Sequence, residues 1–165
     1  IMAITTVQQL DMRGVRQMIA TALSLPDDAV LDANDDINVT NHDNFLTVLV
    51  SNENEIGSQS RYDSVHETEI LSSVRELTLS VNAYGLNAYQ MISNLALAIK
   101  LTPVYQLQRK LRIGFLRASQ VRSLSASVSG GKEPRAQIDL IFSINHIIQA
   151  DIMRGESIKI KTEVN

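Results

Sequence analysis

Apolar side chains recur at helical spacing in two parts of the chain. The first pattern predicts a helix from Thr6 to Leu23 that Thr5 or Thr6 can cap. The second begins after Asn87, a candidate N-cap, and ends near Lys100. A third, shorter helix is expected from Pro103 to Leu111.

Alternation of apolar and polar residues predicts strands elsewhere. Asn44–Val50 is a short segment rich in β-branched residues, and residues 72–84 alternate strictly until Gly85 interrupts them. Residues 135–145 (RAQIDLIFSIN) form a second long alternating run, typical of a half-buried strand. Ser157–Thr162 (SIKIKT) can add a small edge strand whose lysines point outward.

Two segments lack a clear period. Ser51–Glu67 is polar, and we interpret it as either a long loop or an extended hairpin; loops of this length in compact domains are usually functional. Residues 111–134 read as loop or weak strand, with a turn at Gly130–Gly131.

The order of these elements is not a strict alternation of strands and helices. It therefore predicts an α+β fold, in which helices pack on one face of a mixed, largely antiparallel sheet. A chain of 165 residues, 44% of them apolar, is long enough to build this fold as one domain, residues 1–165.

Composition excludes several kinds of chemistry. The chain has no cysteine, so disulfides, thiol catalysis and thiolate metal sites are impossible. The three histidines are far apart in the sequence, and no apolar run is long enough to span a bilayer. We expect no contact with a membrane.

The segment 32–43 (DANDDINVTNHD) begins like a calcium-binding loop. Such a loop needs a glycine at its sixth position and a bidentate glutamate at its twelfth, where this chain has Ile37 and Asp43. A β-branched residue resists the positive φ that the sixth position requires. We interpret the segment as a solvated acidic loop and expect no metal.

The sequence contains no complete catalytic motif. The stretch SGGKEP has Ala126 where a phosphate-binding loop needs its first glycine, and Glu133 where it needs serine or threonine. Most carboxylates lie in polar segments, where nothing would shift their pKa values. We therefore expect no enzyme activity and no cofactor.

The charges are unevenly distributed. Residues 1–72 hold twelve acidic and three basic residues, whereas residues 73–165 hold six acidic and twelve basic ones, for a net charge of −3. Either the two halves match within one molecule, or the acidic face of one subunit meets the basic face of the next.

The basic run at residues 109–122 has three interpretations. It can be a solvated face, a surface that binds another subunit, or a weak contact with the nucleic-acid backbone. Aromatic residues make up 4% of the chain, too few for a platform on which bases stack. The acidic counterpart in the same chain favours a protein partner.

Two blocks resemble a known family. The block RELTLSVNAYGLNAYQMISNLALAI resembles the strand, YG.NA motif and helix of the tail or neck terminator proteins of tailed bacteriophages. The later EPRAQIDLIFSIN resembles the long strand near the C-terminus of that family. The opening helix, the polar segment and these two blocks follow the order of the family.

The resemblance implies a structural protein of the virion, assembled in the host cytoplasm. It implies a ring, usually a homohexamer, that ends the tail tube, joins it to neighbouring neck or adaptor rings, and passes the genome through its lumen. A long polar arm, here Ser51–Thr68, is a hallmark of the family. The alternatives are another head–tail adaptor or tail-completion ring, or a nucleic-acid-binding module that uses residues 109–122.

We expect the end of the polar arm to pack on a neighbouring ring or subunit. We expect the charged surfaces to form subunit contacts, which would make the oligomer sensitive to salt. The candidate interface residues are Asp27, Asp28, Asp32, Asp35, Asp36, Arg61, Tyr62, Arg109, Lys110, Arg112, Arg117 and Arg122.

Overall fold

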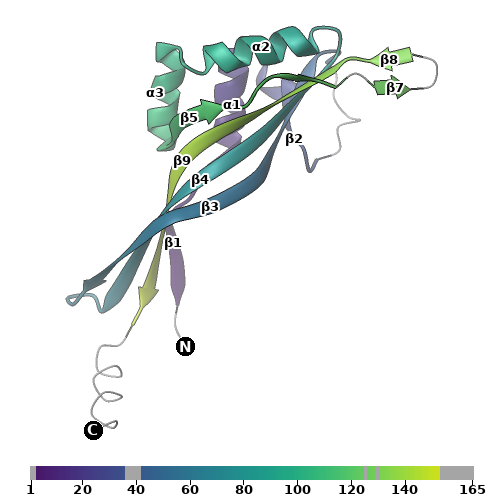
Figure 1. The fold of residues 1–165 in the computed structure, drawn as a ribbon. Helices are drawn as coiled ribbons and strands as arrows, with labels where there is room; N and C mark the ends of the chain where they lie inside the picture. The colour runs from purple at the N-terminus through teal and green to yellow at the C-terminus, as the bar shows by residue number, and fades with distance from the viewer. Residues whose placement is uncertain (1–2, 36–41, 125, 129–130, 153–165) are drawn as a thin grey trace.

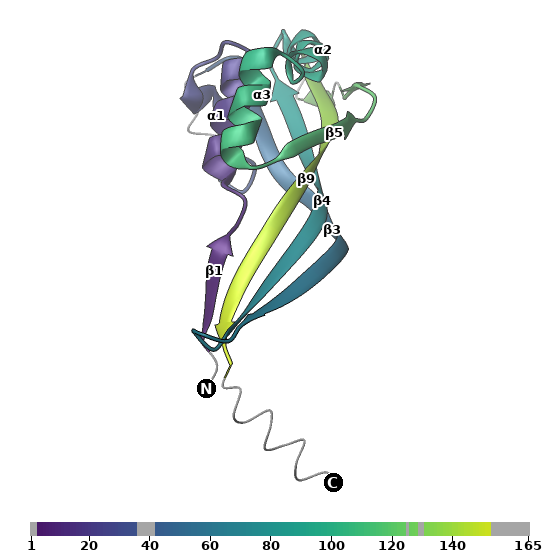
Figure 2. The ribbon, with the colours of Figure 1, turned by 90° about the vertical axis from the view of Figure 1, so that its left-hand side faces the viewer.

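The computed structural model describes residues 3–35, 42–124, 126–128 and 131–152 (Figure 1). One end of a long, twisted sheet is covered by helices, and the other end extends away from them (Figures 1 and 2). In chain order the elements are β1 (Ile4–Gln8), α1 (Met12–Ala22), the 3₁₀ helix η1 (Asp27–Ala29), β2 (Val30–Asp32), β3 (Phe45–Asp63), β4 (Thr68–Tyr84), α2 (Ala88–Ala98), α3 (Thr102–Leu111), β5 (Gly114–Ala118), β6 (Arg122–Ser123), β7 (Ala126–Val128), β8 (Gly131–Glu133) and β9 (Arg135–Asp151).

The predicted α+β class is confirmed. The main sheet has seven strands, with β1, β9, β4, β3 and β2 side by side and with β5 and β6 also paired to β9. The pairing of β2 with β3 is parallel, and the other pairings in this sheet are antiparallel. The small β7–β8 hairpin forms a separate two-stranded sheet.

The apolar core lies on one face of the sheet, under the helices. Alternate residues of β4 and β9 are fully buried under the helices, and each buried apolar residue of β4 faces a buried apolar residue of β9, as in the Leu79–Leu140 pair. Helices α1, α2 and α3 supply the other half of the core through residues such as Ile19, Ile92 and Val104. The helices therefore pack on one face, as the alternation predicted.

The predicted first helix begins too early. Residues Ile4–Gln8 form β1, which pairs with the end of β9, and the helix starts only at Met12. Its N-cap is Asp11, whose side chain accepts a hydrogen bond from the Gly14 backbone nitrogen at 3.1 Å. The prediction failed because Val7 and Leu10 fit helical spacing by chance, whereas the β-branched run before them pairs with an available sheet edge.

The polar segment is an extended hairpin and not a loop. The predicted strand at Asn44–Val50 is only the start of β3, which continues through the polar residues to Asp63. Its partner β4 begins at Thr68, and the two strands stay paired from Phe45–Tyr84 to Asp63–Thr68 with two bulges. Of the two interpretations, the hairpin is correct.

The remaining predictions agree in outline. Helices α2 and α3 lie where the periodicity placed them, but Asn87 makes no capping hydrogen bond through its side chain. The segment after α3 contains short strands, as expected for weak strand character. The predicted strand at Ser157–Thr162 lies outside the described residues. No helix in the described part of the chain is long and apolar enough to cross a membrane.

Gly85 ends β4 with a conformation that other residues rarely adopt. Its φ is +112°, and a Cβ atom built on it would lie 2.5 Å from the backbone oxygen of Asp43 and 2.3 Å from Oδ1 of Asn44. That same Asn44 oxygen accepts a hydrogen bond from the Asn87 backbone nitrogen at 3.2 Å. The glycine therefore allows Asn44 to hold the start of α2.

Replacing Gly85 with alanine is expected to lower the free energy of unfolding by about 2 kcal/mol or more, because strain and a backbone clash add. Gly57→Ala is the matched control, since its Cβ would meet no atom within 4 Å. Urea denaturation followed by circular dichroism measures both variants. Equal stability of the two would show that the turn relaxes without cost.

Candidate assembly surface

The sheet extends beyond the helices as a narrow stalk. We define the stalk as β1, residues 57–63 of β3, residues 68–74 of β4 and residues 145–151 of β9, which the strand register places at one level. It contains no member of the buried apolar core. Figures 1 and 2 show the stalk extending away from the end of the sheet that the helices cover. Neither of its faces is therefore covered by the helices in a single chain.

Apolar side chains are exposed on the stalk. Ile4 and Val7 of β1 are 58% and 56% exposed, and Leu71 of β4 is 39% exposed. Tyr62 and Val74 of the stalk are exposed too, as is Val65 in the turn at the hairpin tip. Sheets of soluble proteins usually bury the apolar side chains of at least one face, so these residues indicate a surface that a partner covers.

The face turned away from the helices holds a shallow groove. It has a volume of about 330 Å³ and is lined by Val7, Gln59, Arg61, Ile70, Ser72 and Ile147. Arg61, a predicted interface residue, therefore lies on this face. Tyr62, the next residue, is paired with Glu69 and points to the opposite face. Arg61 and Tyr62, the two predicted interface residues at the end of β3, therefore lie on opposite faces of the stalk.

A polar network ties the hairpin together at the base of the stalk. Arg75 donates to Ser73 at 3.0 Å and lies 3.4 Å from Glu53, and the Ser73 hydroxyl donates to Glu55 at 2.5 Å. These side chains share the face that the helices cover farther along the sheet. Where the apolar core ends, side-chain hydrogen bonds hold β3 and β4 together.

The tip of the hairpin is a hydrogen-bonded turn around Asp63. Its carboxylate accepts from the Val65 backbone nitrogen at 3.0 Å and contacts His66 Nδ1 at 2.8 Å. The hydrogen bond from His66 lowers the pKa of Asp63 below its ordinary value of 3.8. The support that this carboxylate gives the turn is therefore present above pH 3.8 and is lost as the pH falls through the lowered pKa.

Among the described residues, the stalk has two edges that pair with no strand. In the described part of the chain, β2 pairs with β3 only as far as Val48, and no strand pairs with residues 49–63 on that side. Residues 49–62 are all exposed. On the other side of the sheet, β1 pairs with β9 and has no described strand beyond it. Open edges of this length invite pairing with another chain.

Comparison with protein families gives a match that covers most of the chain. The family described as phage neck terminator protein matches residues 12–165, from the start of α1 onward. The chain belongs to this family. No curated protein matches it. As a neck terminator it acts where the neck joins the tail, associates with other neck and tail proteins, and is part of the virion.

The acidic residues of this neck terminator lie beside β2. Asp27 and Asp28 are exposed in η1, and Asp28 Oδ1 lies 2.8 Å from His42 Nε2. Asp32 accepts from the Asn34 backbone nitrogen at 2.9 Å and is 3.8 Å from Arg16. Asp35 is exposed, and Asp36 lies outside the described residues.

The basic residues separate into two groups. Arg117 pairs with Glu76, and Arg122 lies 3.8 Å from Asp139 and 3.3 Å from Gln137, so both are engaged on the sheet of the same chain. The other group is at the end of α3, where Arg109 and Lys110 are exposed and Arg112 donates to Gln8 of β1 at 2.8 Å.

The acidic and basic segments approach each other within one molecule at one place. Asp27 and Lys110 both line a groove of about 420 Å³ between α1 and α3. The described ion pairs of Asp27–Asp35 do not include a residue from 109–122. The prediction that the acidic loop faces the arginines of a neighbour stays a prediction, with Arg109, Lys110 and Arg112 as the available partners.

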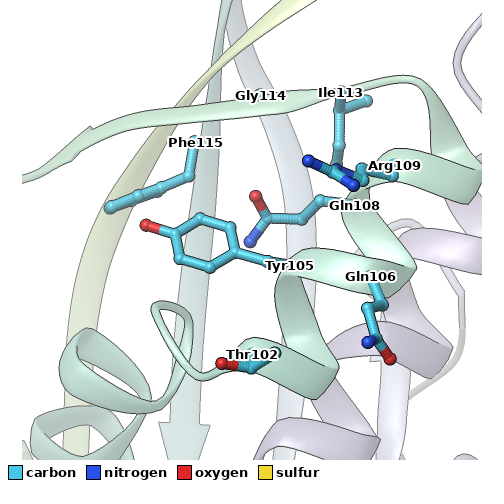
Figure 3. Close-up of a pocket in the computed structure, with 8 residues that line it drawn as sticks. All are labelled: Thr102, Tyr105, Gln106, Gln108, Arg109, Ile113, Gly114 and Phe115. Atoms are coloured by element: carbon cyan, nitrogen blue, oxygen red, sulfur yellow. The ribbon is translucent and has the colours of Figure 1, made fainter.

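A further groove that sequence patterns did not indicate lies between α3 and β5 (Figure 3). It holds about 450 Å³, and Tyr105 and Phe115 border it on one side, with Arg109 and Ile113 on the other. Gln108 is buried beneath it and donates to the Ile99 carbonyl at 3.0 Å. The exposed Tyr105 on an otherwise polar helix face was the available signal.

Proposed function

We propose that this neck terminator assembles into a closed homohexameric ring at the junction of head, neck and tail. The ring ends the tail tube, joins it to the neighbouring neck and tail rings, and leaves a lumen through which the genome passes. It is assembled in the host cytoplasm, and it has no catalytic role. The chain is a binding and scaffolding protein whose partners are copies of itself and adjacent rings.

The observation that carries this proposal is the stalk. A four-stranded sheet with exposed apolar residues and two unpaired edges is incomplete as a single chain. Two different edges on one chain allow a head-to-tail contact between copies. Such contacts close into a ring when a whole number of equal rotations between copies makes one full turn. Membership of the neck terminator family supports a position where the neck joins the tail.

The competing nucleic-acid interpretation finds less support. A phosphate-binding surface needs several free cations on one face. Arg117 and Arg122 are instead engaged with acidic side chains of their own sheet, so Arg109, Lys110 and Arg112, at the end of α3, are the members of the basic run that form no ion pair in the described part of the chain.

Measurement of the mass in solution tests the proposal. Light scattering should give about six times the monomer mass of 18.3 kDa, and negative-stain images should show rings with a central opening. Because charged surfaces contribute to the contacts, the ring should be more stable in 0.15 M salt than in 1 M salt, where the Debye length falls from about 8 to 3 Å. On dilution, it should therefore dissociate at a lower protein concentration in 0.15 M salt than in 1 M salt. A monomer that retards DNA in a gel would instead support the nucleic-acid module.

A further inference from the structure

The two open edges of the stalk belong to strands that run in opposite directions. Successive antiparallel pairings connect β3 to β4, β4 to β9 and β9 to β1. Rotation about an axis parallel to the strands does not change the direction of a strand. The β1 strand of a second copy rotated in this way is therefore antiparallel to the free edge of β3 in the first copy. That is the orientation in which two strands exchange the most favourable backbone hydrogen bonds.

We propose that the free edge of β3 pairs with β1 of the next copy, so that the stalk sheets of neighbouring subunits are continuous. The inference rests on the proposed ring and names its contact. It uses residues before the segment that the family matches, because β1 ends at Gln8 and the match begins at residue 12. The contact is therefore argued from the residues of this chain alone.

The register within one chain fixes which residues meet. Thr6 pairs with Ile148, Ile148 with Leu71, and Leu71 with Ser60, so Thr6 and Ser60 lie at one level. By the same steps Ile4 is level with Tyr62, through Ala150 and Glu69.

A ring has no translation along its axis, so copies meet at equal levels when the axis follows the strands. The exposed Ile4 of one copy then packs on the exposed Tyr62 of the next.

The bulges of β3 favour the same register. They interrupt the strand at Ser51 and Ile56, and residues 57–63 continue without a bulge. Bulges and charged residues protect an exposed edge from random pairing. They leave a regular segment, Gly57–Asp63, that is long enough for the five residues of β1.

Charge supports the same alignment. The outer side of β1 opens into a groove of about 440 Å³ whose lining includes Lys110 and Arg112. Gly114, which follows them, is level with Asn54 through Ser143 and Glu76. The residues on either side of Asn54 are Glu53 and Glu55, both exposed, and within their own chain Glu53 lies 3.4 Å from Arg75 and Glu55 accepts a hydrogen bond from Ser73. The neighbour therefore brings two carboxylates to the level of two cations.

Engineered cysteines test the contact, because the chain has none of its own. The double variant Thr6→Cys/Ser60→Cys should form disulfides between copies on mild oxidation and give a ladder of covalent oligomers up to six chains. A disulfide within one chain is excluded, since β9 and β4 separate the two positions by about 14 Å of sheet and a disulfide needs Cα atoms within about 7 Å.

Two companion pairs, Thr6→Cys with Ser58→Cys and Thr6→Cys with Tyr62→Cys, cover a shift of two residues either way on the same face. The control Thr6→Cys/Gln59→Cys places the thiols on opposite faces and should give at least tenfold less product.

If the wild type forms rings and none of the three pairs cross-links, the edge pairing is wrong and the ring proposal stands. If the wild type stays monomeric, both are wrong. Dimers from Ser60→Cys alone would show β3 pairing with β3 and overturn the proposal.

A charge exchange provides a second, independent test. Lys110→Glu and Glu55→Lys should each raise the protein concentration needed for half assembly by about fivefold, the upper range for an exposed ion pair. The combined variant should recover at least half of that loss.

Asp28→Lys is the matched control from the acidic loop, and it should not rescue Lys110→Glu. Rescue by Asp28→Lys and none by Glu55→Lys would place the basic residues against the acidic loop of the neighbour and overturn the register proposed here.

Discussion

Replacing Leu79 with alanine will lower the free energy of unfolding by about 2–5 kcal/mol. Leu79 is fully buried in β4, between Val50 of β3 and Leu140 of β9. Truncation removes apolar contacts and leaves a cavity that the close-packed strands cannot collapse. For a chain of this size the thermal midpoint should fall by roughly 5–15 °C.

Leu71→Ala is the matched control, because it is the same residue on the same face of the same strand. Leu71 lies in the stalk and is 39% exposed, so its truncation should cost less than about 1.5 kcal/mol. Thermal and urea unfolding of the monomer, measured at a concentration below assembly, gives both values. Equal losses would mean that the stalk is as tightly packed as the helix-covered sheet.

Removal of the stalk hairpin will abolish ring formation and leave a folded chain. The variant replaces residues 56–74 with Asn-Gly, so that a two-residue hairpin turn joins Glu55 to its partner Arg75. The deleted segment contains no member of the buried apolar core, so the helix-covered part of the sheet keeps its packing. It does contain the free β3 edge from Gly57 onward, Tyr62, and part of the groove on the stalk.

The expected result is a monomer by light scattering, at concentrations where the full chain forms rings. Its thermal midpoint should fall less than that of Leu79→Ala. Val65→Ser is the control, since it changes an exposed residue at the hairpin tip, 84% accessible, without altering either strand edge. Rings formed by the truncated chain would remove the stalk from the assembly contact.

Sequence patterns predicted the elements that border the apolar core. β4, β9, α2 and α3 have periodicities set by one buried face, and that periodicity is a direct consequence of burial. The first helix and β1 were confused because a short segment at a sheet edge buries little and so carries little pattern. The same reason explains why Ser51–Glu67 left a loop and a hairpin equally open.

The sequence alone did not distinguish the candidate interface residues that pair within their own chain from those that do not. Arg117 and Arg122 look like Arg109 and Lys110 in a basic run, yet each of the first two meets a carboxylate brought from β4 or β9. Pairings of this kind join residues far apart in the chain, so no local spacing reveals them. The open edge of β3 is likewise a property of the sheet order.

The sequence by itself determined the α+β class, the apolar face of the long strands, the absence of thiol chemistry and the resemblance to neck terminators. Each of these depends on residue type or local spacing. Only the tertiary structure decided that the polar segment extends the sheet as a stalk, that β1 and β3 leave two edges unpaired among the described residues, and which cations form no ion pair there. Those features depend on cross-strand register, which is set by contacts between distant segments and by the place where the buried core ends.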